Sequence, residues 1–313
     1  MKNFKITAND NMKRIDNFLM KLLPHLSRNE IFSLLRNNKV KVNGKKTKHD
    51  YRLSFNDSID IYLNDQYFQT ETNDLFKLTK NDLNIIFEDE NILLLNKPIG
   101  LITHEDNKEN IHTLLNKLKL YMFESKQWDP EVEQTFEPSL CNRLDRNTSG
   151  IVIAAKNIEA LRNMNEIIKN NEVKKLYYCV VYNKINKKED TLYAYHQKDM
   201  HKNIVKIIDS PQVGYKKIIT KYKVIKSTDK YSVLEVELLT GKTHQIRAHL
   251  SFLKHPIIGD NKYSNKYVDK DTRFKTQLLV SYKIIFKTNN EYFKYLNNKE
   301  FKLNKIWFLD KFL

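Results

Sequence analysis

The sequence NRLDRNTSG at residues 142–150, followed by IVIAA at residues 151–155, is the most informative stretch of this chain. Arginine is scarce, with 9 Arg against 45 Lys, yet two of the nine flank Asp145. Positive charge on both sides favours the ionised carboxylate, and a guanidinium can orient it. Thr-Ser-Gly is typical of a turn, and the apolar run that follows it is typical of a buried strand. Asp145 is therefore predicted to lie on a loop that leads into the core. The residues alone fit an Arg–Asp ion pair on a solvated turn equally well.

Glycine use draws attention to the same kind of segment. The chain has six glycines, and such a chain should keep them where the backbone needs positive φ or a close approach. Five of the six fall in short, unusual strings: VNG at 42–44, KPIG at 97–100, the Asp145 loop, TGKTHQIR at 240–247 and PIIGD at 256–260.

Composition indicates a globular chain with an anionic partner. Its 313 residues suffice for one large domain or two unequal ones. A net charge of +16 predicts binding to an anionic polymer. Because 45 Lys and 35 Asn bias the whole chain, local arginines carry more weight than the total. Four of the nine arginines lie in the first 52 residues and predict phosphate contacts there: Arg14, Arg28, Arg36 and Arg52.

Other residue types exclude several classes of protein. Cys141 and Cys179 are too few for a disulfide framework or a cysteine metal site, which fits a reduced cytoplasmic location. No apolar signal segment or membrane-length apolar run is present, so we expect no membrane association. The histidines at 244, 249 and 255 have spacings that do not place two ligands on one helix face. We therefore predict no metal and no cofactor.

The first part of the chain is predicted to be a small α+β module. Apolar residues at helical spacing precede Pro24, and Ser27 with Glu30 forms a capping box for a second helix. Residues 39–42 and 58–63 alternate as strands, and Asn43-Gly44 is a hairpin signal. We assign residues 1–70 to this module and the polar residues 71–82 to a linker.

Residues 83–313 are predicted to form a second, larger α+β domain. Strands are expected at 85–87, 92–95, 151–155, 177–182, 218–225, 232–239 and 283–287, and helices at 111–123, 157–170 and 243–252. Because strands and helices do not alternate regularly, the sheet should be mixed or antiparallel rather than a parallel doubly wound sheet.

These strings, in this order, resemble the RluA-type pseudouridine synthases over about 200 residues. Residues 142–150 are similar to the family's His-Arg-Leu-Asp-Arg-x-Thr-Ser-Gly motif, residues 240–247 to its Thr-Gly-Arg-Thr-His-Gln-Ile-Arg motif, and residues 96–104 to its Asn-Lys-Pro-x-Gly…His segment. Lys175-Leu176-Tyr177 resembles its Lys-x-Tyr strand. The resemblance implies that the chain isomerises uridine in RNA by cleaving the C1′–N1 bond and joining C5 to C1′.

The same resemblance implies roles for individual residues. Asp145 would face the ribose, either as nucleophile at C1′ or as base at C2′, with Arg247 in an ion pair with it. Tyr177 would stack on the flipped uracil and assist proton removal from C5. The implied substrate contacts are Arg143, Arg146, Lys97, His104, Lys242 and an apolar wall at Leu279, with Arg143 and Arg146 meeting phosphate or filling the vacated space.

Residues 12–63 resemble an S4-type RNA-binding domain. The RNA contacts implied there are Arg14, Ser27, Arg28, Arg36, Lys39 and Asn43. The string KTKHDYRL at 46–53 is similar to the RluC-like branch, which acts on large-subunit (23S) ribosomal RNA. The partner implied is therefore ribosomal RNA or an assembly intermediate, and we expect the protein to act as a monomer.

The sequence departs from these patterns at four positions. Asn142 stands for the usual His, Lys242 for Arg, Val280 for His, and Asn56 for the Gly favoured in S4 domains. Asparagine tolerates the left-handed region, and none of the four removes an ionisable group that the reaction needs.

Two other functions are compatible with parts of the sequence. A non-catalytic RNA-binding ribosome-assembly factor would keep the first module and an inactive synthase fold, but it would have no reason to retain Asp145, Tyr177 and Arg247 together. A nucleoside hydrolase would typically use a pair of carboxylates, and the Asp145 motif holds one.

Overall fold

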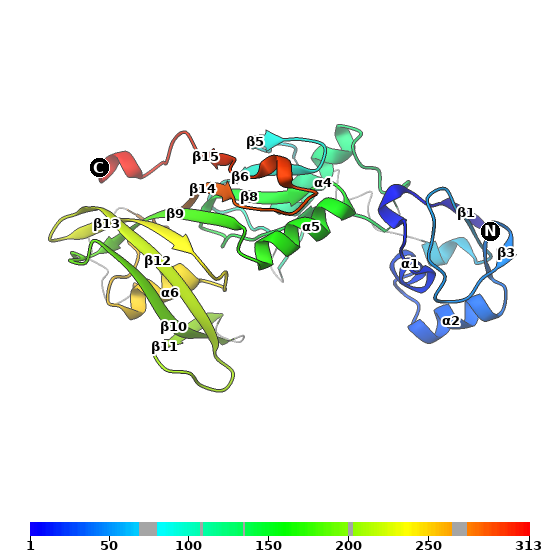
Figure 1. Cartoon of the computed structure of the whole chain (residues 1–313), viewed down its shortest axis with the longest axis horizontal. Helices are drawn as coiled ribbons and strands as arrows, with labels where there is room; N and C mark the ends of the chain where they lie inside the picture. Colours follow the sequence, from blue (N-terminus) through cyan, green and yellow to red (C-terminus); the bar gives the residue numbers. More distant parts are fainter. Residues whose placement is uncertain (69–79, 107–108, 134, 200–202, 265–273) are drawn as a thin grey trace. The chain divides into compact units, whose positions relative to one another are not determined.

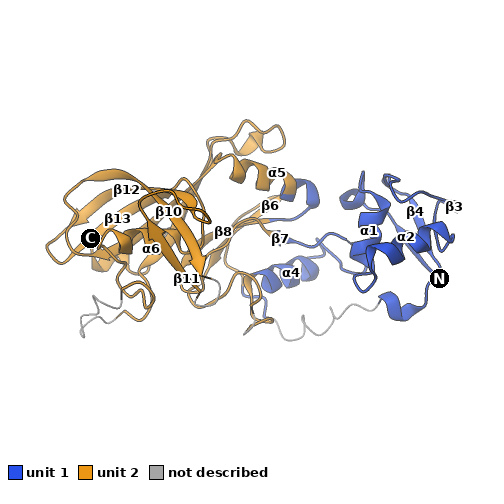
Figure 2. Cartoon of the chain, turned by 90° about the horizontal axis from the view of Figure 1, so that it is seen from below, with its two compact units in different colours: residues 1–82, 115–139, 155–161 blue, residues 83–114, 140–154, 162–313 orange. Residues whose placement is uncertain are grey.

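The computed structural model describes residues 1–68, 80–106, 109–133, 135–199, 203–264 and 274–313. These residues group into two compact units (Figure 2). Unit 1 holds Met1–Asp82, Leu115–Ser139 and Ala155–Leu161, and unit 2 holds Leu83–Leu114, Leu140–Ala154 and Arg162–Leu313. The division into a module, a linker and a domain stays a prediction, and residues 71–79 of the linker lie outside the described residues.

The amino-terminal part of unit 1 is a two-helix, four-stranded module (Figure 1). Its elements are β1 (Lys2–Lys5), α1 (Ile15–Leu22), α2 (Arg28–Arg36), β2 (Val40–Val42), β3 (Lys45–Lys46) and β4 (Ser58–Ile61), with sheet order β1-β4-β2-β3. The two predicted helices and the predicted strands are confirmed. Strand β1 was not predicted, because its four residues include two lysines and its one apolar residue, Phe4, is only partly buried.

Local sequence explains the start and turns of this module. Ser27 Oγ accepts from Glu30 N, and the Glu30 carboxylate accepts from Ser27 N, so the predicted capping box is confirmed. Asn43 and Gly44 both have positive φ, as a two-residue hairpin requires. Asn56 also lies in the left-handed region, which explains why asparagine is tolerated there.

The remaining elements include the large sheet that carries the site (Figure 1). The helices are α4 (Leu114–Glu124), α5 (Ile158–Lys169) and α6 (Gln245–Phe252). The strands are β5 (Ile85–Glu88), β6 (Ile92–Lys97), β7 (Ser139–Leu140), β8 (Ser149–Ala155), β9 (Val173–Tyr182), β10 (Glu189–Asp199), β11 (Ile204–Ile208), β12 (Lys216–Ser227), β13 (Tyr231–Leu238), β14 (Leu279–Phe286) and β15 (Glu300–Lys302).

The sheet of unit 2 has mixed orientation, as predicted. Its order is β11-β10-β12-β13-β9-β14-β8-β6-β5, with β15 beside β14. Strand β14 is antiparallel to β9 and parallel to β8. All seven strands predicted beyond residue 83 and all three helices are present, with shifted ends. Strands β10 and β11 were missed, because each buries only scattered side chains and shows no regular alternation of buried and exposed residues.

Gly150 lets strands β8 and β14 come unusually close. It has φ +118°, and a Cβ built on it would lie 2.1 Å from the Ser281 carbonyl oxygen. Ser281 and Gly150 are register partners in the parallel pair. Only glycine fits this approach, which places the strand that follows the Asp145 loop against the strand that begins at Leu279.

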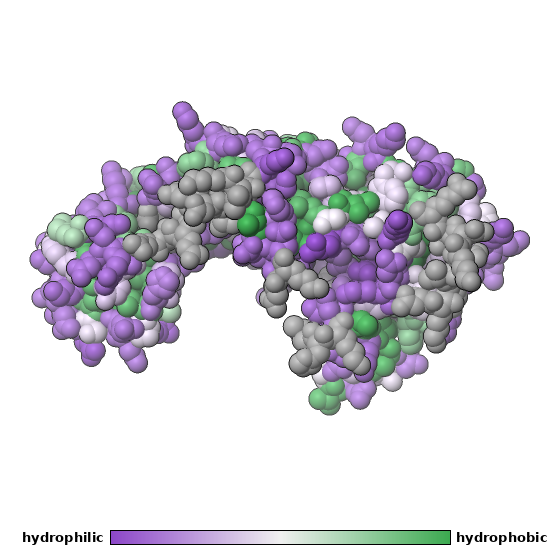
Figure 3. Space-filling model, turned by 180° about the vertical axis from the view of Figure 1, so that it is seen from behind, coloured by the Kyte–Doolittle hydropathy of each residue, from purple (hydrophilic) through white to green (hydrophobic). Residues whose placement is uncertain are grey.

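The exposed surface is mainly hydrophilic. On the face shown in Figure 3, hydrophobic side chains form small patches among polar ones. No helix among the described residues has the length and apolar character needed to cross a membrane.

Candidate active site

The loop that carries Asp145 is held by the segment at residues 97–103. Thr103 Oγ1 donates to the Leu144 carbonyl at 2.7 Å and accepts from Leu144 N at 3.2 Å. Gly100 N donates to the Arg146 carbonyl at 2.9 Å, and within the loop Thr148 N donates to the Asp145 carbonyl at 3.0 Å. Backbone bonds on both sides therefore fix the position of Asp145 before any substrate binds.

The structure does not bring Lys97 into the pocket. Its side chain is fully buried, and Nζ donates to the carbonyls of Pro98, Leu101 and Arg146 at 2.7–3.0 Å. Burial lowers the pKa of Lys97 to about 7, and the three carbonyls are the acceptors that an ammonium group requires. Lys97 thus ties its own turn to the Asp145 loop, a role the lysine alone did not reveal.

Arg247 joins two carboxylates. Its Nη1 donates to Asp145 Oδ2 at 2.7 Å, while Nε and Nη2 donate to the two oxygens of Asp260 at 2.6 and 2.9 Å. Burial alone would lower the pKa of Arg247, but the hydrogen bonds and charge of Asp260, together with Asp145, raise it. The expected Arg247–Asp145 ion pair is present, and Asp260 orients the guanidinium from behind.

Asp260 is the anchor of this arrangement. It is fully buried, and its Oδ1 also accepts from the backbone N–H groups of Lys262 and Tyr263. These donors replace the hydrogen bonds to water that a carboxylate loses on burial. Asp260 lies in the PIIGD string at 256–260, but sequence spacing does not assign it as the buried partner of Arg247.

His244 lies near Asp145 Oδ1, the carboxylate oxygen that Arg247 does not bond. Its Nε2 lies 3.9 Å from Asp145 Oδ1, and its Nδ1 lies 2.9 Å from the Tyr263 hydroxyl. The residue precedes α6 with φ 53°, in the left-handed region that few residues with a Cβ adopt. Burial lowers the pKa of His244 to about 4, so the imidazole is neutral at physiological pH.

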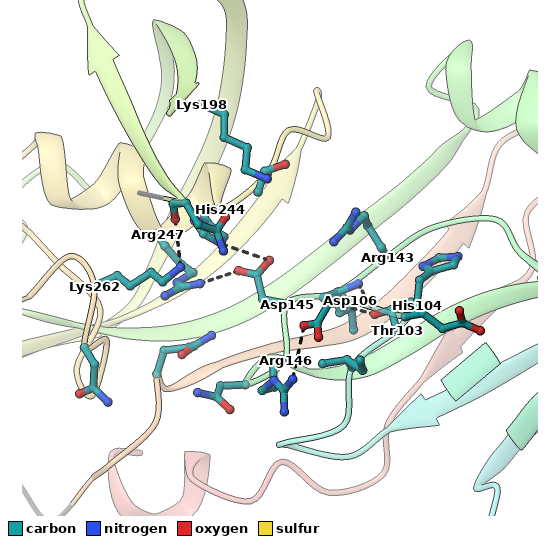
Figure 4. Close-up of a pocket in the computed structure, with 18 residues that line it drawn as sticks. Thr103, His104, Asp106, Arg143, Asp145, Arg146, Lys198, His244, Arg247 and Lys262 are labelled. Atoms are coloured by element: carbon teal, nitrogen blue, oxygen red, sulfur yellow. Dashed lines mark hydrogen bonds and ion pairs between the residues drawn. The ribbon is translucent and has the colours of Figure 1, made fainter. Parts of the chain in front are cut away.

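A cavity of about 560 Å³ opens around Asp145 (Figure 4). In the close-up, Lys198, His244, Arg247 and Lys262 lie on one side of Asp145, and Arg143 and His104 on the other. The further lining residues include Thr103, Asp106, Arg146, Asn203, Thr243, Asn261 and Gln277. The cavity therefore surrounds one central carboxylate with cationic side chains from several separate segments.

Tyr177 and Leu279 share a second, small cavity of about 60 Å³ with Asp145, Lys242 and Arg247. Tyr177 is 5% exposed, and its hydroxyl is hydrogen-bonded to Ser281, its register partner on β14. Burial raises the pKa of Tyr177 to about 12, so the phenol is protonated at neutral pH. The structure thus brings Tyr177, Leu279 and Lys242 to the carboxylate, as the resemblance implied.

Two of the departures have structural roles. Asn142 Oδ1 accepts from Ile153 N at 2.7 Å, so the amide bonds the following strand where the family has an imidazole. Val280 is buried in β14 opposite Ser149.

Three of the residues predicted to bind RNA are exposed on the surface of the amino-terminal module, and two others are bonded within it. Arg28 and Arg36 are exposed on α2, and Lys39 is exposed before β2. Arg14 instead donates to Asp16 from Nε and Nη2, and Asn43 is bonded to both Asp57 and Ser58. A further groove is lined by Asn29, Phe32, Leu35, Arg36, Lys46, Thr47, Lys48 and His49.

Within the described residues, no group of three His, Cys, Asp or Glu side chains is arranged to hold a metal ion.

The sequence did not indicate Lys198, Lys262 or Tyr263 as site residues. None of the three belongs to a recognised motif, and Lys198 lies on β10, a strand that was not predicted.

Comparison with known proteins agrees with this geometry. The RNA pseudouridylate synthase family matches residues 91–252, and the S4 domain family matches residues 13–59. The chain belongs to the RNA pseudouridylate synthase family and is an isomerase that carries an S4 domain.

Relatives extend the likeness to nearly the whole chain. An uncharacterized RNA pseudouridine synthase of Mycoplasma genitalium is 36% identical over 289 residues, 90% of this chain and 88% of the relative. Ribosomal large subunit pseudouridine synthase D of Borreliella burgdorferi is 31% identical over 98% of this chain and 92% of its own. Ribosomal large subunit pseudouridine synthase C of Buchnera aphidicola is 32% identical over 84% and 81%.

A solved structure supports the fold. Human RNA pseudouridylate synthase domain containing 4 superposes with a TM-score of 0.56 at 20% identity, covering 72% of this chain and 90% of its own.

Proposed function

We propose that this enzyme isomerises uridines of large-subunit ribosomal RNA, with Asp145 as the catalytic carboxylate. One observation carries the proposal: Asp145 lies at the centre of a cationic cavity, with one oxygen bound to Arg247 at 2.7 Å and the other 3.9 Å from a neutral imidazole. Two observations suggest ribosomal RNA as the substrate. The relatives from Buchnera aphidicola and Borreliella burgdorferi are named ribosomal large subunit pseudouridine synthases C and D, and the chain carries an S4 domain.

The proposed reaction uses Asp145, held by Arg247, and proceeds in three steps on the uridine. The C1′–N1 bond breaks, the uracil turns, and C5 bonds to C1′ while C5 loses a proton and N1 gains one. Asp145 acts on the ribose, as nucleophile at C1′ or as base at C2′. Arg247 keeps the carboxylate oriented, since Asp260 prevents its guanidinium from turning.

The small cavity is the proposed place of the flipped uracil. The Tyr177 ring provides a stacking face, worth about 1–3 kcal/mol for a base on an aromatic ring. Leu279 forms an apolar wall. Because the Tyr177 hydroxyl is protonated at neutral pH, we propose that its oxygen hydrogen-bonds the C5–H group during the last step, while water takes up the C5 proton.

The cationic walls are the proposed path of the RNA backbone. Arg143 and His104 would meet it on one side of Asp145, and Lys198 with Lys262 on the other. Arg146 lines the same cavity and would add a further contact. Lys262 is partly buried, and burial followed by the charges of Arg247 and Lys198 lowers its pKa. A phosphate between these cations would relieve their repulsion. On the amino-terminal module, Arg28, Arg36 and Lys39 would add further backbone contacts.

The proposal is tested by mapping pseudouridine in large-subunit ribosomal RNA from cells with and without the protein. We expect discrete uridines to lose the modification when the protein is absent. Purified protein should then restore them on an unmodified transcript. Restoration of no site, with RNA binding intact, would instead favour the non-catalytic assembly factor.

Removing both lysines of one cavity wall should weaken RNA binding without stopping the reaction. For Lys198→Ala with Lys262→Ala we expect KM to rise about tenfold or more with kcat within a few-fold. The slope of log K against log salt should become shallower by about 1.4, since each single-strand phosphate contact contributes about 0.7.

Two exposed lysines on β12 provide the control. Lys221→Ala with Lys223→Ala removes the same charge outside the cavity. If the control pair changes KM and the salt slope as much as the cavity pair does, the effect reflects total charge and the proposed path is wrong.

A further inference from the structure

The Tyr263 hydroxyl lies between a backbone donor and the active-site imidazole. Val205 N donates to Tyr263 Oη at 2.9 Å, and His244 Nδ1 lies 2.9 Å from the same oxygen. In the part of the chain that the structure describes, these are the hydroxyl's two hydrogen-bonding partners. Because burial raises the pKa of Tyr263 to about 12, the hydroxyl keeps its single proton.

That proton decides the tautomer of His244. The Val205 N–H cannot accept a hydrogen bond, so of these two partners His244 Nδ1 is the one that can accept the hydroxyl proton. A neutral imidazole that accepts at Nδ1 carries its own proton on Nε2. The Nε2–H group is the one that faces Asp145 Oδ1 across 3.9 Å, a gap that a small side-chain rotation would close.

We propose that Tyr263 is a positioning residue that holds His244 as the Nε2–H tautomer, so that this N–H restrains Asp145 Oδ1 while Arg247 holds Oδ2. The proposal rests on the proposed function, because the consequence of the restraint is a carboxylate aimed at the ribose. His244 and Tyr263 act through Asp145 and need not contact the substrate.

A neutral His244 also suits the charge balance. The charged groups that face it are Asp145 from its loop, Arg247 from α6, and Lys262 and Asp260 from the segment after α6. Protonation would add a cation beside Arg247 and Lys262 and draw charge away from the reactive carboxylate. The Tyr263 proton disfavours that state, because it occupies the site that a second imidazole proton would need.

A purely structural role for Tyr263 makes different predictions. Its ring lies 5.4 Å from the Arg247 guanidinium, and its hydroxyl binds the start of β11 through Val205. Loss of those contacts would alter stability or RNA binding, but it would leave the protonation of His244 and the pH dependence of the reaction unchanged.

The test uses the full chain with Tyr263→Phe, which keeps the ring and removes the hydroxyl. We expect kcat to fall about tenfold with KM within about twofold. The pH profile of kcat should gain an acidic limb, because His244 loses the donor that favours its neutral form and titrates at higher pH. Tyr193→Phe is the matched control on β10, exposed and outside the cavity, and should leave both unchanged.

Nitrogen NMR of histidine-labelled protein reports the tautomer without relying on activity. In the wild type we expect His244 to carry its proton on Nε2, and in Tyr263→Phe to show a mixture of tautomers. His244→Gln, which keeps an N–H group, should retain more activity than His244→Ala. A wild-type His244 protonated on Nδ1, or an unchanged pH profile in Tyr263→Phe, would overturn the proposal. Wild-type protein inactive on RNA would refute the proposed function and leave the NMR result to decide the tautomer.

Discussion

Replacing Asp145 by asparagine should reduce pseudouridine formation to background, a loss of more than about 1000-fold, while the protein remains folded and binds RNA. The amide keeps the shape of the side chain but cannot act as nucleophile or base. Folding should survive because Arg247 retains its two bonds to Asp260, so no buried guanidinium is left without a carboxylate. Single-turnover release of the C5 hydrogen as tritium, together with RNA affinity, measures both expectations.

Asp106→Asn is the matched control for that experiment. Asp106 lines the same cavity and is paired with Arg146 at 3.4 Å, but about half of its side chain is exposed. It should keep activity within a few-fold. Near wild-type turnover by Asp145→Asn, or an equal loss in both variants, would remove Asp145 from the catalytic role.

The second large effect concerns stability. Gly150→Ala should destabilise the protein by on the order of 4 kcal/mol, because the new Cβ would lie 2.1 Å from the Ser281 carbonyl and the backbone has φ +118°. Urea unfolding followed by circular dichroism measures the change. The midpoint should fall strongly, and any folded fraction should show impaired activity, since β8 follows the Asp145 loop directly.

Gly241→Ala separates this effect from the general cost of replacing glycine. A Cβ at Gly241 meets no atom within 4 Å, and its φ is outside the left-handed region. Stability should change by less than about 0.5 kcal/mol. A Gly150→Ala protein as stable as this control would show that β8 and β14 do not approach so closely in solution.

Local sequence predicted the secondary structure well where apolar residues follow a strict period. Helix α1, the capped helix α2 and the buried strand β8 are examples, since their patterns arise from neighbours along the chain. Strands β10 and β11 were missed because they bury few side chains, so that tertiary pairing with β12 rather than periodicity maintains β10.

The same distinction applies to the candidate site. Asp145, Tyr177 and Arg247 occur in recognisable motifs, and the structure brings them together. Lys97 was expected at the substrate because the resemblance implied a contact there, and the three carbonyls that converge on its ammonium group could not be foreseen from the sequence. Tyr263 bonds His244, and Lys198 lines the same cavity as Asp145. Both placements arise from long-range packing, which leaves no local trace in the sequence.

The parallel pairing of β8 with β14 also fixes when the enzyme becomes competent during synthesis. The Asp145 loop leaves the ribosome early, but the strand against which β8 packs, and which carries Leu279 and the Ser281 partner of Tyr177, is made near the end of the described chain. Such distant pairings form late, because closing a long loop costs entropy before any contact offsets it. A nascent chain that has not yet released β14 would therefore hold the proposed catalytic carboxylate without a finished pocket, and catalysis would begin only after β14 has been made and paired.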